Sequence, residues 1–127
     1  MEKIYLTGKD DSPEVIIDVD KNLYEISGRS IPENANLLYN NIIDWFKQNL
    51  KDIEEEIELS IQLEYYNSAS AKKIIELLLV LEEYSQSNNN IKVIWYYFDN
   101  DLNMEKKGRE LFSIINIPFE IRNINND

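Results

Sequence analysis

The sequence predicts a single α/β domain over residues 1–127, with a mixed β-sheet of about five to six strands covered by about three helices. Three observations lead to this prediction. A chain of 127 residues is typical of one domain. Its N-terminal part carries short apolar stretches separated by turn residues, and the remainder alternates between helical and extended patterns. Such alternation favours parallel strands joined by crossover helices, packed in two or three layers.

The N-terminal part predicts three strands, because each short apolar or alternating stretch is bounded by Gly, Pro, Asp or Asn. We expect these strands at residues 3–6, 14–19 and 23–27, with residues 20–22 as a hairpin turn. A first helix begins near Pro32, because proline and acidic residues are favoured in the first turn of a helix. Apolar residues at helical spacing continue it to about Leu50.

The clearest strand covers residues 57–65, where apolar and polar residues alternate without a break as far as Tyr65. Together with an apolar strand at residues 91–98, it is predicted to lie inside the sheet. Turn residues and helical spacing divide the rest of the chain. We expect a turn at residues 67–70, a helix at 71–84, a polar loop at 85–90, a helix from about 102 that Pro118 ends, a last edge strand at 119–121 and a frayed tail at 123–127.

The composition excludes several classes of function. Lys and Arg number 13 and Asp and Glu number 24, so the net charge is −11, and a surface of this sign repels nucleic acid and anionic membranes. The chain has no cysteine and no histidine, which removes disulfides, thiolate nucleophiles, imidazole bases and most zinc or haem sites. No signal peptide pattern begins the chain, and the longest apolar run, residues 77–81, is too short to span a bilayer. We therefore expect a cytoplasmic protein without a cofactor, whose partners are proteins.

Two pairs of acidic residues stand two positions apart, Asp18 with Asp20 and Asp99 with Asp101. In extended backbone both members of a pair point to one side, where they could hold a divalent cation. Solvated turn residues are the commoner explanation of such pairs. A small Mg²⁺-dependent enzyme using Asp99 and Asp101 stays open, although no His, Cys or phosphate-binding loop accompanies them.

The turn Asn67-Ser68-Ala69-Ser70 lies where a strand ends and a helix begins. Backbone N–H groups and the helix dipole favour a negative group at such a place. In the simpler interpretation Ser70 caps the helix and Ser68 is an ordinary turn serine. In the other interpretation the turn is a phosphorylation site. Elsewhere, Arg29 could pair with an acidic neighbour or touch a partner.

Four segments of the chain, taken in order, resemble the SiaC family of bacterial regulatory phosphoproteins, which are similar in fold to the STAS-type anti-sigma factor antagonists. They are residues 12–15, 26–34, 63–72 and 95–101. The ordered set carries the resemblance, since no segment is specific alone. The resemblance implies a STAS-like fold and a phosphorylated residue directly after the turn asparagine, which is Ser68 here. Ser70 is the alternative acceptor.

The resemblance implies a protein that is not an enzyme and acts by partner switching. A cognate Ser/Thr kinase phosphorylates it, a metal-dependent phosphatase removes the phosphate, and the unphosphorylated form binds an effector. In the family's best-known branch the effector is a diguanylate cyclase, which makes cyclic di-GMP. We expect the partner-binding residues to be Asn67, Ser68, Ser70 and Arg29.

Three other functions remain open at the level of the sequence. An anti-sigma factor antagonist would use the same serine to bind an anti-sigma kinase. A binding module would never be modified at Ser68. The Mg²⁺-dependent enzyme mentioned above is the third.

Overall fold

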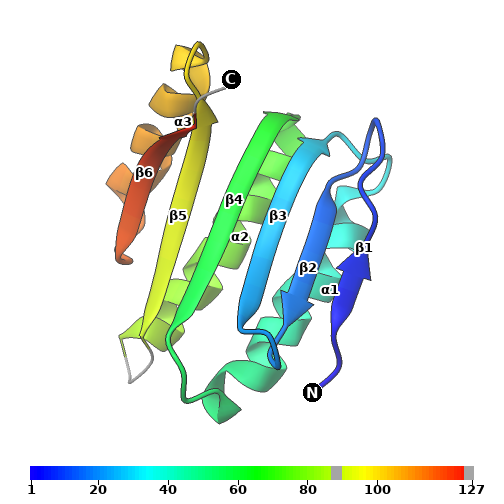
Figure 1. Cartoon of the computed structure of the whole chain (residues 1–127), viewed down its shortest axis with the longest axis vertical. Helices are drawn as coiled ribbons and strands as arrows, with labels where there is room; N and C mark the ends of the chain where they lie inside the picture. The colour runs from blue at the N-terminus through cyan, green and yellow to red at the C-terminus, as the bar shows by residue number, and fades with distance from the viewer. Residues whose placement is uncertain (87–89, 125–127) are drawn as a thin grey trace.

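The computed structural model describes residues 1–86 and 90–124. It contains a six-stranded sheet in the order β1-β2-β3-β4-β5-β6 (Figure 1). The first three strands pair antiparallel and the last four pair parallel, so the sheet is mixed as predicted. The strands are β1 (Ile4–Leu6), β2 (Glu14–Asp18), β3 (Leu23–Ser30), β4 (Ile57–Tyr66), β5 (Ile91–Phe98) and β6 (Phe119–Ile124).

Three helices join the parallel strands, and all of them cover the same face of the sheet. Each crossover moves one strand further in the same direction, and right-handed crossovers then put every helix on one side. Figure 1 shows the sheet lying in front of α1 and α2, with α3 beside β5 and β6. The fold therefore has two layers. The helices are α1 (Ala35–Asn49), α2 (Ser68–Ser85) and α3 (Leu102–Ile114), and a short 3-10 turn, η1 (Leu50–Asp52), follows α1.

The core lies between the sheet and the helices. Alternate residues of β4 point into it, while Glu58, Ser60 and Gln62 occupy the other, partly exposed face. This alternation is what residues 57–65 predict. Burying one large apolar side chain stabilises the fold by about 1.5–3 kcal/mol. The largest fully buried side chains are Trp95, Tyr24, Tyr39, Phe46, Ile17, Ile26, Ile42, Ile43, Leu50, Ile57, Leu59 and Ile61.

A bulge near the end of β4 interrupts the predicted alternation. Gly28 pairs with Leu63 and Arg29 with Tyr65, so Glu64 is an extra residue on β4. After the bulge the two faces are exchanged: the side chain of Tyr65 is 48% exposed, and Tyr66 packs against the core. The prediction of unbroken alternation through Tyr65 is therefore wrong at its last residue. Gly28 has φ +99° at this point, a conformation that favours glycine.

The second helix begins earlier than predicted. It starts at Ser68 instead of Ala71, because the Asn67 side chain accepts a hydrogen bond from the Ser70 N–H and so acts as the N-cap. The four residues expected to form a turn thus comprise the cap and the first three residues of α2.

The last strand is longer than predicted. Asn123 and Ile124, which we expected in a frayed tail, belong to β6 and pair with Tyr97 and Phe98 of β5. The Asp99 N–H also donates to the Ile124 carbonyl oxygen at 3.0 Å, so the sheet continues through residue 124. The rest of the expected tail, residues 125–127, and residues 87–89 of the expected loop lie outside the described residues. Within the described ranges, no helix combines the length and the apolar character that crossing a membrane requires.

Candidate functional site

The predicted site lies at the carboxyl ends of β3 and β4, where α2 begins. The Asn67 N–H donates to the Ser30 carbonyl oxygen at 3.1 Å, which ties the start of α2 to the end of β3. Arg29 stands at the same end of the sheet, with its guanidinium carbon 5.8 Å from the centre of the Tyr65 ring. Its Nε donates to the Asp10 carbonyl oxygen at 3.0 Å. Asn67, Ser68 and Ser70 are thus brought together, and Arg29 lies near them without a hydrogen bond to the turn.

Ser70 is fully buried in a network of hydroxyl groups. Its Oγ donates to the Ser30 carbonyl oxygen and accepts from the Ser30 Oγ, both at 2.9 Å. A further hydrogen bond of 2.6 Å joins the Ser30 Oγ to the Tyr39 hydroxyl on α1. Burial raises the pKa of Tyr39, so the network is neutral at ordinary pH. It connects β3, α1 and α2 beneath the turn.

Ser68 faces solvent at the first position of α2. In the part of the chain that the structure describes, its hydroxyl makes no hydrogen bond. The N–H groups of a first helical turn have no partner within the helix, and the helix dipole favours negative charge there. Ser68 and Ser70 are two residues apart, yet only the Ser68 Oγ can be reached from outside.

A pocket of about 210 Å³ opens beside this turn, between α2 and α3. Trp95 and Tyr66 line it from the sheet, and Lys107 places its Nζ 4.7 Å from the centre of the Tyr66 ring. Burial raises the pKa of Tyr66, and the charge of Glu110 adds to this. The helices contribute mostly apolar groups, namely Ala71, Ile74, Ile75, Leu111 and Ile114.

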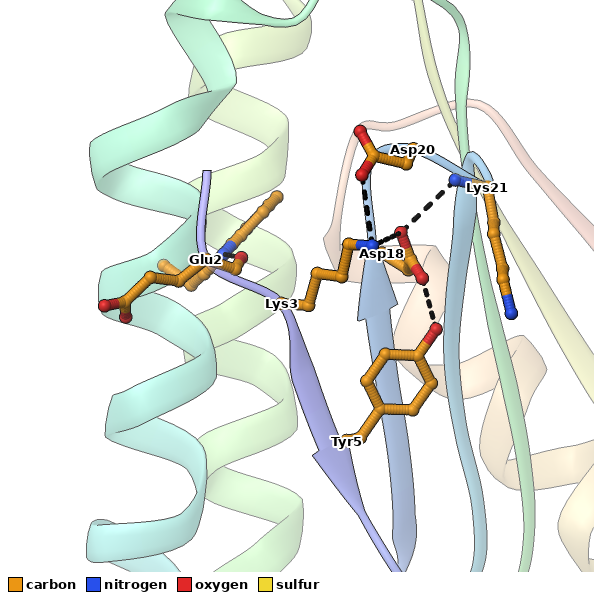
Figure 2. Close-up of polar contacts among 7 residues, drawn as sticks. Glu2, Lys3, Tyr5, Asp18, Asp20 and Lys21 are labelled. Atoms are coloured by element: carbon orange, nitrogen blue, oxygen red, sulfur yellow. Dashed lines mark hydrogen bonds and ion pairs between the residues drawn. The ribbon is translucent and has the colours of Figure 1, made fainter.

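The first acidic pair is a structural contact at the edge of the sheet. We expected Asp18 as a solvated turn residue, but it is fully buried, because Tyr5 and Lys3 cover it (Figure 2). The Tyr5 hydroxyl and, at 3.2 Å, the Lys21 N–H donate to its carboxylate. The Lys3 Nζ lies 3.7 Å from Asp18 and 3.0 Å from Asp20.

These contacts change the ionisation of the acid and its partners. The hydrogen bond from Tyr5 lowers the pKa of Asp18, and the Lys21 N–H and the Lys3 charge lower it further against the effect of desolvation. The same hydrogen bond raises the pKa of Tyr5. Asp18 is therefore an ionised group that holds β1 on the sheet.

The second acidic pair is also occupied by structural contacts. Asp101 Oδ1 accepts from the Met104 N–H at 3.0 Å and so caps α3. Asp99 Oδ1 accepts from Asn123 Nδ2 at 2.7 Å. Among the described residues, no group of three or more His, Cys, Asp or Glu side chains could hold a metal ion.

Sequence reasoning missed four residues around the turn. Ser30, Tyr39 and Lys107 reach it through tertiary contacts, for which the sequence carries no local signal. Lys72 could have been found, because it follows Ser68 by four residues in a helix and such pairs share a face.

Comparison with known proteins gives a consistent result over nearly the whole chain. Residues 6–124 match the family model described as SiaC family regulatory phosphoprotein. An uncharacterized protein of Pseudomonas aeruginosa is 27% identical over 122 residues, which cover 96% of this chain and 97% of that protein.

Two solved structures from the same organism share the fold. Apo-SiaC has a TM-score of 0.86 at 27% identity, over 96% of this chain and 99% of that one. SiaC in a complex with the diguanylate cyclase SiaD, of which it is described as the activator, has a TM-score of 0.89 at 26% identity, over 95% and 99%.

Proposed function

Because the chain belongs to the SiaC family of regulatory phosphoproteins, we propose that it is the switch protein of a bacterial partner-switching system, phosphorylated reversibly at Ser68. Membership of this family makes it a regulatory protein rather than an enzyme. The two acidic pairs already have structural partners, which supports leaving the Mg²⁺-dependent enzyme aside.

One observation supports the choice of Ser68 above all others: the contrast between the two serines of the turn. A kinase must bring the γ-phosphorus of ATP to the hydroxyl oxygen. The new oxygen–phosphorus bond forms as ADP leaves, and a base of the kinase takes the hydroxyl proton. Ser68 is exposed and meets this requirement, whereas Ser70 is fully buried and its Oγ is already bonded on two sides. We therefore propose Ser68 as the acceptor and give Ser70 a supporting role.

In this proposal a cognate Ser/Thr kinase adds the phosphate, and a metal-dependent phosphatase removes it by hydrolysis. The phosphoryl group adds about −1.5 to −2 charges at pH 7. A dianion at the centre of a docked surface loses its hydration without a matching cation, which costs several kcal/mol. Binding in the unphosphorylated form and release after phosphorylation follow from this cost. Since ATP is the phosphoryl donor, the proposed location is the cytoplasm.

The proposed effector is a diguanylate cyclase, because the relative of known structure is described as the activator of one. Exposed groups at the carboxyl end of the sheet would make the contact, and they include Ser68 and Arg29, with Asn67 partly exposed between them. Ser70 would act indirectly, since no partner can touch it in this conformation.

An affinity experiment in lysate of the source bacterium tests this function. Parent protein, Ser68→Asp and Ser68→Asn serve as baits, because Asp and Asn have nearly the same size and differ in charge. We expect a diguanylate cyclase to be retained by the parent and by Ser68→Asn and to be depleted at least about tenfold on Ser68→Asp, equivalent to about 1.4 kcal/mol. Retention of an anti-sigma kinase would instead support the antagonist function. Equal retention of all proteins by the three baits would contradict the switch.

A further inference from the structure

Ser68 has a cation on its own helix. Lys72 follows it by four residues in α2, and side chains at this spacing lie on the same face with Cβ atoms about 5–6 Å apart. Lys72 is exposed, and it has no ion pair among the described residues. Its neighbour Lys73 is already engaged, with Asn40 at 2.7 Å and Glu76 at 2.9 Å.

A second cation lies on α3, beside the residue that precedes the turn. The Lys107 Nζ lies over the ring of Tyr66, which is two residues before Ser68. Lys107 also lines the pocket together with Ala71, which is three residues after Ser68 and one turn along α2. Lys107 thus lies at the pocket beside the turn, and Lys72 lies one turn into α2.

Contacts of α3 with Trp95 hold this helix against β5 and so keep the backbone of Lys107 beside the pocket. The Trp95 Nε1 donates to the Met104 carbonyl oxygen at 3.0 Å. Gly108, next to Lys107, lies against the same indole, where an added Cβ would be 2.5 Å from Trp95 Cδ1. Any larger residue would push α3 away from β5.

Taking the phosphorylation of Ser68 from the proposed function, we propose that the phosphate is bound within the protein by Lys72 and Lys107, so that it bridges α2 and α3 at the mouth of the pocket. Ammonium groups form charge-assisted hydrogen bonds to phosphate oxygens. Two lysines also offset the acids at this end of the molecule, Glu64 on β4 and Glu110 on α3.

The bridge changes what the protein offers to a partner. Lys107 moves from the Tyr66 ring to the phosphate, and the phosphate with its two lysines stands across the pocket opening. A partner that binds both the unmodified turn and the apolar groups of the pocket can then reach neither of them.

Phosphoserine placed at position 68 during synthesis tests the bridge without any kinase. The titration of its second proton is followed by ³¹P NMR at low salt in the parent, Lys72→Gln, Lys107→Gln and the double variant. An ammonium group hydrogen-bonded to the phosphate lies about 4 Å from the phosphorus and, in water, lowers the proton affinity of the phosphate about fivefold. We therefore expect a higher midpoint pH in each single variant than in the parent, and an about thirtyfold higher proton affinity in the double variant. Lys47→Gln/Lys106→Gln is the matched control, since both lysines are exposed and the net charge changes equally.

The midpoints of the variants show whether both lysines bind the phosphate. If only Lys72→Gln moves the midpoint, the phosphate is held on α2 alone and the bridge is wrong. The same midpoint in the parent and the double variant would mean that the phosphate faces solvent. Failure of the protein to carry phosphate at Ser68 in its host would contradict the proposed function and leave the ³¹P result unaffected.

Discussion

The β1 edge and the start of α2 are both polar junctions that hold one element on the fold, and their chemistry is opposite. At the β1 edge an ionised, buried Asp18 is surrounded by Tyr5, Lys3 and the Lys21 N–H, and we call these groups the charged junction. At the start of α2 the groups are neutral, and we call them the neutral junction: the Asn67 amide and the hydroxyls of Ser30, Tyr39 and Ser70. In the proposed switch, this difference lets hydrogen bonds hold the turn while Ser68 accepts a phosphate.

A charged junction beneath Ser68 would work against the proposed switch. A buried carboxylate there would repel the phosphate, whereas a buried cation would lack a partner whenever Ser68 is unphosphorylated. Neutral hydroxyl groups hold the turn without either effect, and they do so without using the Ser68 side chain. The charged junction lies at the β1 edge of the sheet, whereas α2 begins at the carboxyl end of the central strand β4 (Figure 1).

Asp18→Asn should have the largest effect on local stability, because it removes the charge at the centre of the charged junction. The amide keeps the size of the carboxylate but removes the charge that Lys3 and the Tyr5 hydroxyl require. We expect amide hydrogen exchange in residues 4–6 to become about tenfold faster or more, because an edge strand opens locally. Exchange at Ser70 should not change. Asp20→Asn is the control, since its side chain is 79% exposed and a surface ion pair contributes little.

The charged junction should also make stability depend on pH. The pKa of Asp18 is lowered in the fold, so its contribution is present above the unfolded value of about 3.9 and is lost as the pH falls below it. The pKa of Tyr5 is raised, so that contribution is lost as the pH rises above about 10. Melting temperatures of the parent and Asp18→Asn, measured between about pH 2 and 7, should converge at the acid end. A constant difference over this range would mean that Asp18 is not the titrating group.

Ser70→Ala should destabilise the neutral junction by about 1–3 kcal/mol, because the buried Ser30 hydroxyl loses the oxygen to which it donates. Ser68→Ala, two residues away, should change the free energy of unfolding by less than about 0.5 kcal/mol. Urea unfolding of both variants measures the contrast. Equal losses would show that the two serines do not differ in the way their burial indicates.

Asn67→Ala is expected to have the smallest of these effects on a junction, about 1 kcal/mol, because only the helix cap is removed. Exchange of the Ser70 amide should become faster, since this N–H donates to the Asn67 side chain. If that amide stays as protected as in the parent, the cap does not hold the turn.

Periodicity predicted most of the fold because the core is built from one face of each element. The strands β4 and β5, the three helices and the mixed sheet all follow from apolar spacing. The bulge at Glu64 was hidden, because Tyr65 continues the alternating pattern even though its side chain lies on the opposite face. The bulge arises where the pairing of β4 with β3 shifts by one residue, and the local sequence of β4 does not encode this pairing.

The position of the turn between β4 and α2 was predicted, but the contacts that hold it were not. A turn between a strand and a helix placed Ser68 and Ser70 together, and both are good capping residues. Only the tertiary contacts of Ser70 with Ser30 separate the buried serine from the exposed one. Asp18 was misjudged for a related reason, because the tyrosine that covers it is 13 residues earlier in the chain.

Mapping phosphate on the protein isolated from its own host is the sharpest test of the proposal that Ser68 is the phosphorylated residue. Peptide mass spectrometry, in protein prepared with phosphatases inhibited, assigns each phosphate to a residue of the turn. We expect phosphate on Ser68 and none on Ser70, and a Ser68→Ala chain expressed in the same host should carry none in the turn. Phosphate on Ser70, or an unmodified turn under every growth condition that activates the system, would contradict it.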